Sequence, residues 1–144
     1  MVKGNFILPE KPEDWAYGVA LIKSRKSPDK RLRMAMDAIS YVKGKEIVLA
    51  ELLFDTSSAV DVDRRDIGKL YSTIEKYPIQ YFVVFSPDDI TDDLDDLIEF
   101  AYLLGTLGAK ILSIDDDEIV TYEILKQIKS ELEEDTKEAD NHEV

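Results

Sequence analysis

Short apolar runs alternate along the chain with segments of helical periodicity. Four runs have the length and composition of buried strands, and they lie at residues 16–22, 46–53, 79–85 and 110–114. Apolar residues at intervals of three and four, which are typical of amphipathic helices, mark residues 30–41, 67–74, 94–107 and 118–134. Strands that alternate with helices predict an α/β domain with a mostly parallel sheet of four to five strands, flanked by helices on both faces.

The predicted elements divide the chain into three parts. Residues 1–14 contain Pro9, Pro12 and several charges, and we expect an irregular arm there. Residues 15–134 hold the α/β domain, and residues 135–144 form an acidic tail that we predict to be disordered. No apolar run approaches the ~20 residues that a membrane span needs. The first residues also lack the organisation of a signal peptide, so a cytoplasmic protein is expected.

Charge is unevenly distributed along the sequence. The formal net charge is −13, whereas a duplex-DNA binder usually has a positive balance. Residues 23–33 nevertheless hold six basic residues and one acid, and residues 88–99 hold seven acids and no base. The chain has no cysteine, which excludes a disulfide framework, a thiolate metal site and a cysteine nucleophile.

Polar residues follow three of the predicted strands at their carboxyl ends. Ser24 follows the first strand, Asp55 the second, and the acidic stretch 88–92 the third. Open α/β sheets place their ligand sites at this edge, so these residues are the candidates for a functional site. A serine alone carries little weight, because loop and cap positions favour serine as well.

Several spacings match one known family. Counted from Ser24, apolar residues fall at +8, +12 and +15, which are Leu32, Met36 and Ile39. Arg64 lies nine residues after Asp55, and Gly108 closes the third helical segment before the strand at 110–114. In this order and spacing, residues 16–128 resemble the catalytic domain of the serine site-specific recombinases, the resolvase and invertase family.

The resemblance implies both a chemistry and a set of site residues. In that family a serine attacks a DNA phosphodiester and forms a phosphoserine linkage, while arginines stabilise the charge on the phosphate oxygens. Ser24 takes the position of the nucleophile, and Arg64, Asp55 and Asp88 match other site positions. Three positions at which the family carries arginine hold Ile22, Asp89 and Asp92 here. Lys23 and Arg25 are the candidates to replace the lost positive charge near a DNA phosphate.

These departures support two hypotheses. In the first, the chain is a resolvase-like domain with impaired catalysis that acts through protein interaction, as a homodimer or with another protein, through its C-terminal helix. In the second, it is an active DNA strand-exchange domain in which Ser24 forms a phosphoserine–DNA intermediate, and the basic run at 23–33 supports this. The family's small basic DNA-binding domain does not appear before Val144, so DNA is expected as a partner by resemblance alone.

An unrelated response-regulator-like or hydrolase-like α/β domain is a third alternative. Its active site would be a metal pocket, because the carboxylates of Asp88, Asp89, Asp92 and Asp93 offer oxygen ligands to a divalent cation. The same carboxylates fit a helix N-terminus, where the helix dipole favours negative charge. Nothing resembles a glycine-rich phosphate loop, and we expect neither a cofactor nor a metal.

Overall fold

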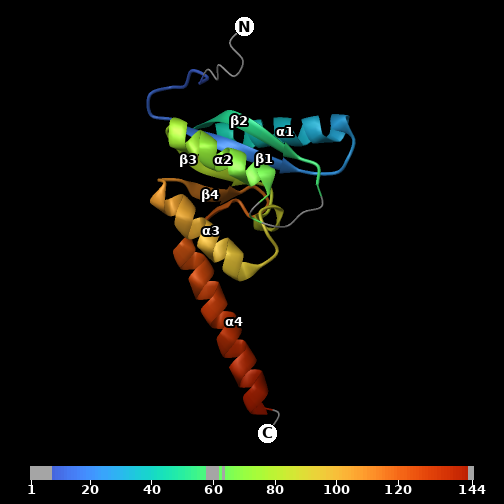
Figure 1. Ribbon diagram of the computed structural model, residues 1–144, viewed down its shortest axis with the longest axis vertical. Coiled ribbons are helices and arrows are strands. Elements are labelled where there is room, and N and C mark those ends of the chain that lie inside the picture. The colour runs from blue at the N-terminus through green and yellow to red at the C-terminus, as the bar shows by residue number, and fades with distance from the viewer. Residues whose placement is uncertain (1–7, 58–61, 63, 143–144) are drawn as a thin grey trace.

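The computed structural model describes residues 8–57, 62 and 64–142 of the chain, and its elements alternate between strands and helices (Figure 1). The strands are β1 (Ala16–Lys23), β2 (Ile47–Asp55), β3 (Ile79–Val84), β4 (Lys110–Ser113) and β5 (Glu118–Val120). The α-helices are α1 (Pro28–Lys43), α2 (Arg65–Lys76), α3 (Leu94–Thr106) and α4 (Tyr122–His142), with a short 3₁₀ turn at Pro87–Asp89.

The strands form one sheet in the order β2-β1-β3-β4-β5. The first four are parallel, and β5 pairs antiparallel with β4. Parallel strands need helical crossovers, and the crossovers place α1 on one face and α2 and α3 on the other. The predicted fold class, a mostly parallel sheet of four to five strands flanked by helices, is confirmed.

Each face of the sheet has its own apolar core because side chains alternate along the strands. On the α2 and α3 face, Phe82 of β3 meets Phe100 of α3 edge-on at 5.8 Å between ring centroids, and Tyr71 of α2 meets Phe100 at 6.1 Å. On the α1 face, Ile22 of β1 packs with the small buried side chains of that helix, which are Ala35, Ala38 and Val42.

The apolar stripe that predicts α1 is not the face that α1 buries. Leu32 and Met36 are each 58% exposed and Ile39 is 44% exposed, because the helix sits on the sheet through its small residues instead. The spacing therefore identified the helix correctly but not its packed face.

Two predicted boundaries differ from the structure. Residues 118–120 were expected to begin the last helix, but they form β5, whose pairing with β4 is a tertiary contact that local periodicity does not report. The structure assigns α4 as far as His142, whereas the sequence places the end of the helix at Glu134. The division of the chain into an arm, a domain and a tail stays a prediction, and residues 1–7, 143 and 144 lie outside the described residues.

Helix α4 leaves the domain and projects away from it (Figure 1). Its first turns are attached to α3: Leu125 is buried, the rings of Tyr102 and Tyr122 lie 5.2 Å apart, and Lys129 pairs with Asp95 at 2.5 Å. Among the described residues, no helix is both long and apolar enough to cross a membrane.

Candidate functional site

Asp55 is the centre of a polar cluster at the carboxyl edge of the sheet. It ends β2, is only 1% exposed, and lies opposite Lys23 in the β1–β2 register. One carboxylate oxygen, Oδ1, accepts hydrogen bonds from the backbone N–H of Ser57 at 2.9 Å and from its hydroxyl at 2.6 Å. The other, Oδ2, faces Lys23 Nζ at 3.5 Å and Arg64 Nε at 2.7 Å. A buried charge of this kind needs such partners to be tolerated.

Arg64 joins this carboxylate to the loop after β3. It stands at the N-cap position of α2, and its side chain is 8% exposed. Besides the Asp55 contact through Nε, Nη1 donates to the carbonyl of Ile90 at 2.6 Å and Nη2 donates to the carbonyl of Asp89. The guanidinium therefore satisfies groups of the protein itself, and it fixes the loop after β3 against the end of β2.

Ser24 lies next to this cluster through its backbone. Its N–H donates to the carbonyl of Asp55 at 3.0 Å, while its half-buried hydroxyl accepts from the N–H of Lys26 at 3.1 Å. The adjacent Lys23 Nζ donates to the carbonyl of Ser57 at 2.9 Å. The structure thus brings together Lys23, Ser24, Asp55 and Arg64, as the sequence spacing predicts for the carboxyl edge.

The acidic stretch after β3 divides into residues with different surroundings. Asp89 is half-buried beside the cluster, whereas Asp88 and Asp92 are exposed. Asp88 and Asp89 lie in the 3₁₀ turn, which Ser86 caps, and do not open α3 as the sequence suggested. That helix is capped by Asp93, whose side chain accepts from the N–H of Asp96 at 3.0 Å. Several of these acids therefore lie where they stabilise the start of α3: Asp93 caps it, and Asp95 and Asp96 lie in its first turn, near the positive end of the helix dipole.

The other singled-out positions take no part in the hydrogen bonds and ion pairs described above for Asp55 and Arg64. Ile22 is fully buried under α1 and belongs to the apolar core. Arg25 is exposed in the loop before α1. In the part of the chain that the structure describes, no group of three or more His, Cys, Asp or Glu side chains is arranged to hold a metal ion.

Sequence reasoning missed two partners in the cluster. One is Ser57, although an aspartate side chain often accepts from the backbone N–H two residues later, as in an Asx turn. The other is the pair of carbonyls at residues 89 and 90, which no side-chain pattern reveals.

Burial and hydrogen bonding act in opposite directions on the carboxylates of the cluster. Burial by itself raises the pKa of Asp55, but hydrogen bonds from Ser57 and Arg64, together with the charge of Lys23, hold that pKa below its usual value. For Asp89, burial dominates and raises the pKa, and the charge of Asp115 adds to this effect. Asp55 is therefore held in its charged form more firmly than Asp89.

These shifts predict the pH dependence of stability. Because the folded-state pKa of Asp55 is depressed, its contribution is fully present above the unfolded pKa and is lost as the pH falls through the folded pKa. Asp89, with a raised folded pKa, instead favours the folded state on acidification. Asp55→Asn should therefore flatten the loss of unfolding free energy below about pH 4. Asp89→Asn should instead remove a gain in unfolding free energy that the wild-type chain makes as the pH falls toward about 4 from above. Urea unfolding between pH 3 and pH 6 measures both slopes, and equal slopes in wild type and Asp55→Asn would contradict this account.

Comparison with known proteins identifies the fold. No protein-family model and no curated protein sequence matches the chain. Among solved structures, the N-terminal catalytic domain of TP901-1 integrase superimposes with a TM-score of 0.66 at 13% identity, covering 82% of this chain and 97% of that one. The C-terminal catalytic domain of ISC1926 TnpA, an IS607-like serine recombinase, superimposes with a TM-score of 0.60 at 20% identity, covering 79% of this chain and 78% of that one. A resolvase family site-specific recombinase from Streptococcus pneumoniae superimposes with a TM-score of 0.59 at 12% identity, covering 89% of this chain and 94% of that one.

Proposed function

From the premise that this chain has the fold of the serine recombinase catalytic domain, we propose that it is a recombination-family domain whose catalysis is impaired and that acts in the cytoplasm by binding other proteins. The observation that carries this proposal is the engagement of Arg64. Its side chain is 8% exposed and donates to Asp55, Ile90 and Asp89. The Arg64 guanidinium would have to break these buried hydrogen bonds before it could bind a phosphate.

The replacement of cations around Ser24 supports the same proposal. Phosphoryl transfer spreads negative charge over the phosphate oxygens, and fixed arginines stabilise that charge with paired hydrogen bonds. Asp89 and Asp92 place carboxylates where the resemblance expects two of these arginines, and Ile22 places an apolar side chain where it expects a third. Replacing arginine with aspartate removes a hydrogen-bond donor, and the carboxylate in addition repels the phosphate.

Helix α4 is the element that we propose for association. It exposes Ile124, Ile128 and Leu132, which fall on one side at intervals of four residues. Water-exposed apolar stripes on a projecting helix favour contact with a second chain. A homodimer or a complex with another protein through α4 would cover them.

The second candidate function is DNA strand exchange with Ser24 as the nucleophile. The basic residues near Ser24 favour it, because Lys23 lies at the same edge of the sheet and Arg25 is exposed beside it. In this function, Arg64 would have to leave Asp55 and turn to the scissile phosphate.

The two functions differ in what the Arg64 guanidinium does when DNA is added. In a ¹⁵N-labelled sample, we expect the Nε–Hε signal of Arg64 to exchange slowly with water and to keep its position when duplex DNA is added at low ionic strength. Arg64→Lys identifies the signal. The exposed Arg25 is the matched control, since its signal reports any DNA that reaches the loop. A DNA-dependent shift of the Arg64 signal together with that of Arg25 would favour strand exchange instead.

A further inference from the structure

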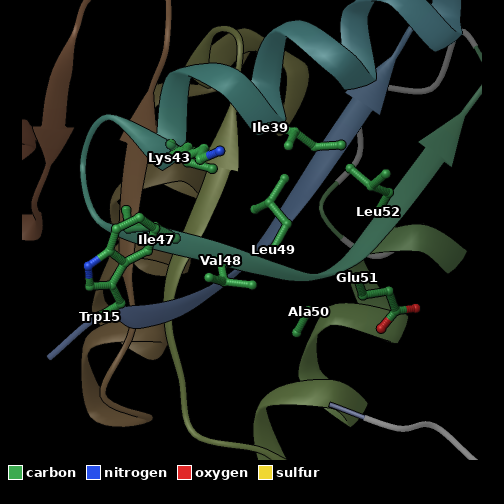
Figure 2. Close-up of a pocket in the computed structure, with 10 residues that line it drawn as sticks. Trp15, Ile39, Lys43, Ile47, Val48, Leu49, Ala50, Glu51 and Leu52 are labelled. Atoms are coloured by element: carbon green, nitrogen blue, oxygen red, sulfur yellow. The ribbon is translucent and has the colours of Figure 1, made fainter. Parts of the chain in front are cut away.

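A second apolar surface lies at the opposite end of the molecule from α4. It combines one side of α1 with the neighbouring strand β2, and we call it the α1–β2 face. Its members are Leu32, Met36 and Ile39 of α1 and Leu49, Leu52 and Phe54 of β2. A groove of about 380 Å³ runs between the helix and the strand. Figure 2 shows Ile39, Leu49 and Leu52 pointing toward a common space in this groove.

The position of β2 in the sheet leaves this face open. Within the described residues, β2 pairs with β1 alone and forms the edge of the sheet. Helix α1 rests on the sheet through Ala35, Ala38 and Val42, so its Leu32, Met36 and Ile39 side is left without a cover. Leu32, Met36, Ile39 and Phe54 are exposed, and Leu49 and Leu52 are partly buried. An apolar surface of this kind is typical of a protein-binding site.

The α4 stripe, defined by Ile124, Ile128 and Leu132, has matching dimensions. At a rise of 1.5 Å per residue the stripe spans about 12 Å, and the apolar side of α1 from Leu32 to Ile39 spans about 10.5 Å. In Figure 1, α4 points away from the end of the molecule that carries α1 and β2. In the conformation described, a chain therefore does not cover its own α1–β2 face with its own α4, whereas a second copy can bring its α4 to that face.

Helices α1 and α4 carry opposite net charges. Helix α1 carries four basic residues against two acids, while the groove itself is lined by one base, Lys43, and one acid, Glu51. Residues 122–135 of α4 carry five acids against two bases, and Glu131 stands between Ile128 and Leu132 in the sequence. Two α4 helices side by side would bring acid against acid, which disfavours that pairing. Docking of α4 on α1 brings opposite charges together.

We propose that the α4 stripe of one copy docks on the α1–β2 face of a second copy. This inference rests on the proposed function of α4 as the association element, and it names the surface that receives the helix. The contact joins two different surfaces. Reciprocal docking, in which each chain gives its α4 to the other, closes the pair as a symmetric dimer.

Engineered cysteines test the contact directly, because the natural chain contains none. A full-length Ile39→Cys chain is mixed with a full-length Leu132→Cys chain under mild oxidation. We expect a disulfide between residues 39 and 132 of different chains, identified by mass spectrometry, to be the main product. Leu107→Cys replaces Leu132→Cys in the control mixture, since Leu107 is similarly exposed but lies in neither surface, and it should cross-link much less.

Sedimentation equilibrium of full-length variants provides an independent measurement. One double variant, Met36→Gln/Ile39→Gln, alters the α1–β2 face, and the other, Ile124→Gln/Ile128→Gln, alters the α4 stripe. Each should weaken self-association by about tenfold or more, because buried apolar area is lost. Mixing the two variants should restore association, since one chain keeps its face and the other keeps its stripe. Leu103→Gln/Leu107→Gln is the matched exposed control and should change little.

Three outcomes would overturn the inference. If the main disulfide instead joins position 132 of one chain to position 132 of another, α4 pairs with α4. Association through α4 would then stand, but the α1–β2 face would not be the surface that receives it. A chain that stays monomeric at all concentrations has no such contact. Self-association that is insensitive to the α1 variant also contradicts it. The Arg64 signal in the presence of DNA tests the impaired catalysis separately, so the two failures are distinguishable.

Discussion

Replacing Arg64 with alanine is expected to lower the free energy of unfolding by about 3–5 kcal/mol, the usual cost of removing one partner of a buried ion pair. The side chains of Asp55 and Arg64 are 2% and 8% exposed, so the carboxylate left behind cannot recover its hydration. The carbonyls of Asp89 and Ile90 would lose their donors at the same time. Lys23, at 3.5 Å from the carboxylate, compensates only in part.

Urea unfolding measures this cost, and Arg65→Ala is the matched control. Arg65 follows Arg64 in the sequence but is exposed, so its loss should change the free energy of unfolding by less than about 0.5 kcal/mol. Because Asp55 and Arg64 form one unit, Asp55→Leu/Arg64→Met should cost less than the sum of the two single changes. A cost below about 1 kcal/mol for Arg64→Ala would show that the pair contributes little to the fold.

The strands and the crossover helices could be predicted from sequence because each has a clear local signal. The apolar runs give β1 to β4, and helical periodicity gives α1 to α4. Strand β5 could not be predicted in this way: its three residues are helical by periodicity, and only pairing with β4 makes them a strand. The buried side of α1 was also not predictable, because small alanines pack against the sheet more closely than the larger Leu32 and Met36.

For the candidate site, spacing predicted proximity but not contacts. The order of strands places Ser24, Asp55 and Arg64 at one edge of the sheet, as a parallel sheet requires. That Arg64 turns inward depends on two carbonyls some 25 residues further along the chain. Backbone carbonyls carry no sequence signature, so the contacts of this arginine could be seen only in the assembled fold.

The second large effect concerns DNA cleavage. Loss of a single charge-stabilising donor slows catalysis about 10²–10³-fold, and the resemblance expects arginines at two positions where this chain has Asp89 and Asp92. With Arg64 bound to Asp55 as well, we expect covalent attack by Ser24 on a DNA phosphodiester to be at least about 10⁴-fold slower than in a site that has its arginines. No phosphoserine–DNA product should therefore accumulate during a normal assay.

Capture of the phosphoserine linkage tests the impaired catalysis most directly. The full chain is incubated with a library of nicked DNA duplexes, in which a nick near the cleavage position traps any covalent product, and an active serine recombinase with its own site is the positive control. We predict no covalent DNA adduct for the wild-type chain, as for Ser24→Ala. A wild-type adduct that maps to Ser24 and disappears in Ser24→Ala would contradict the account.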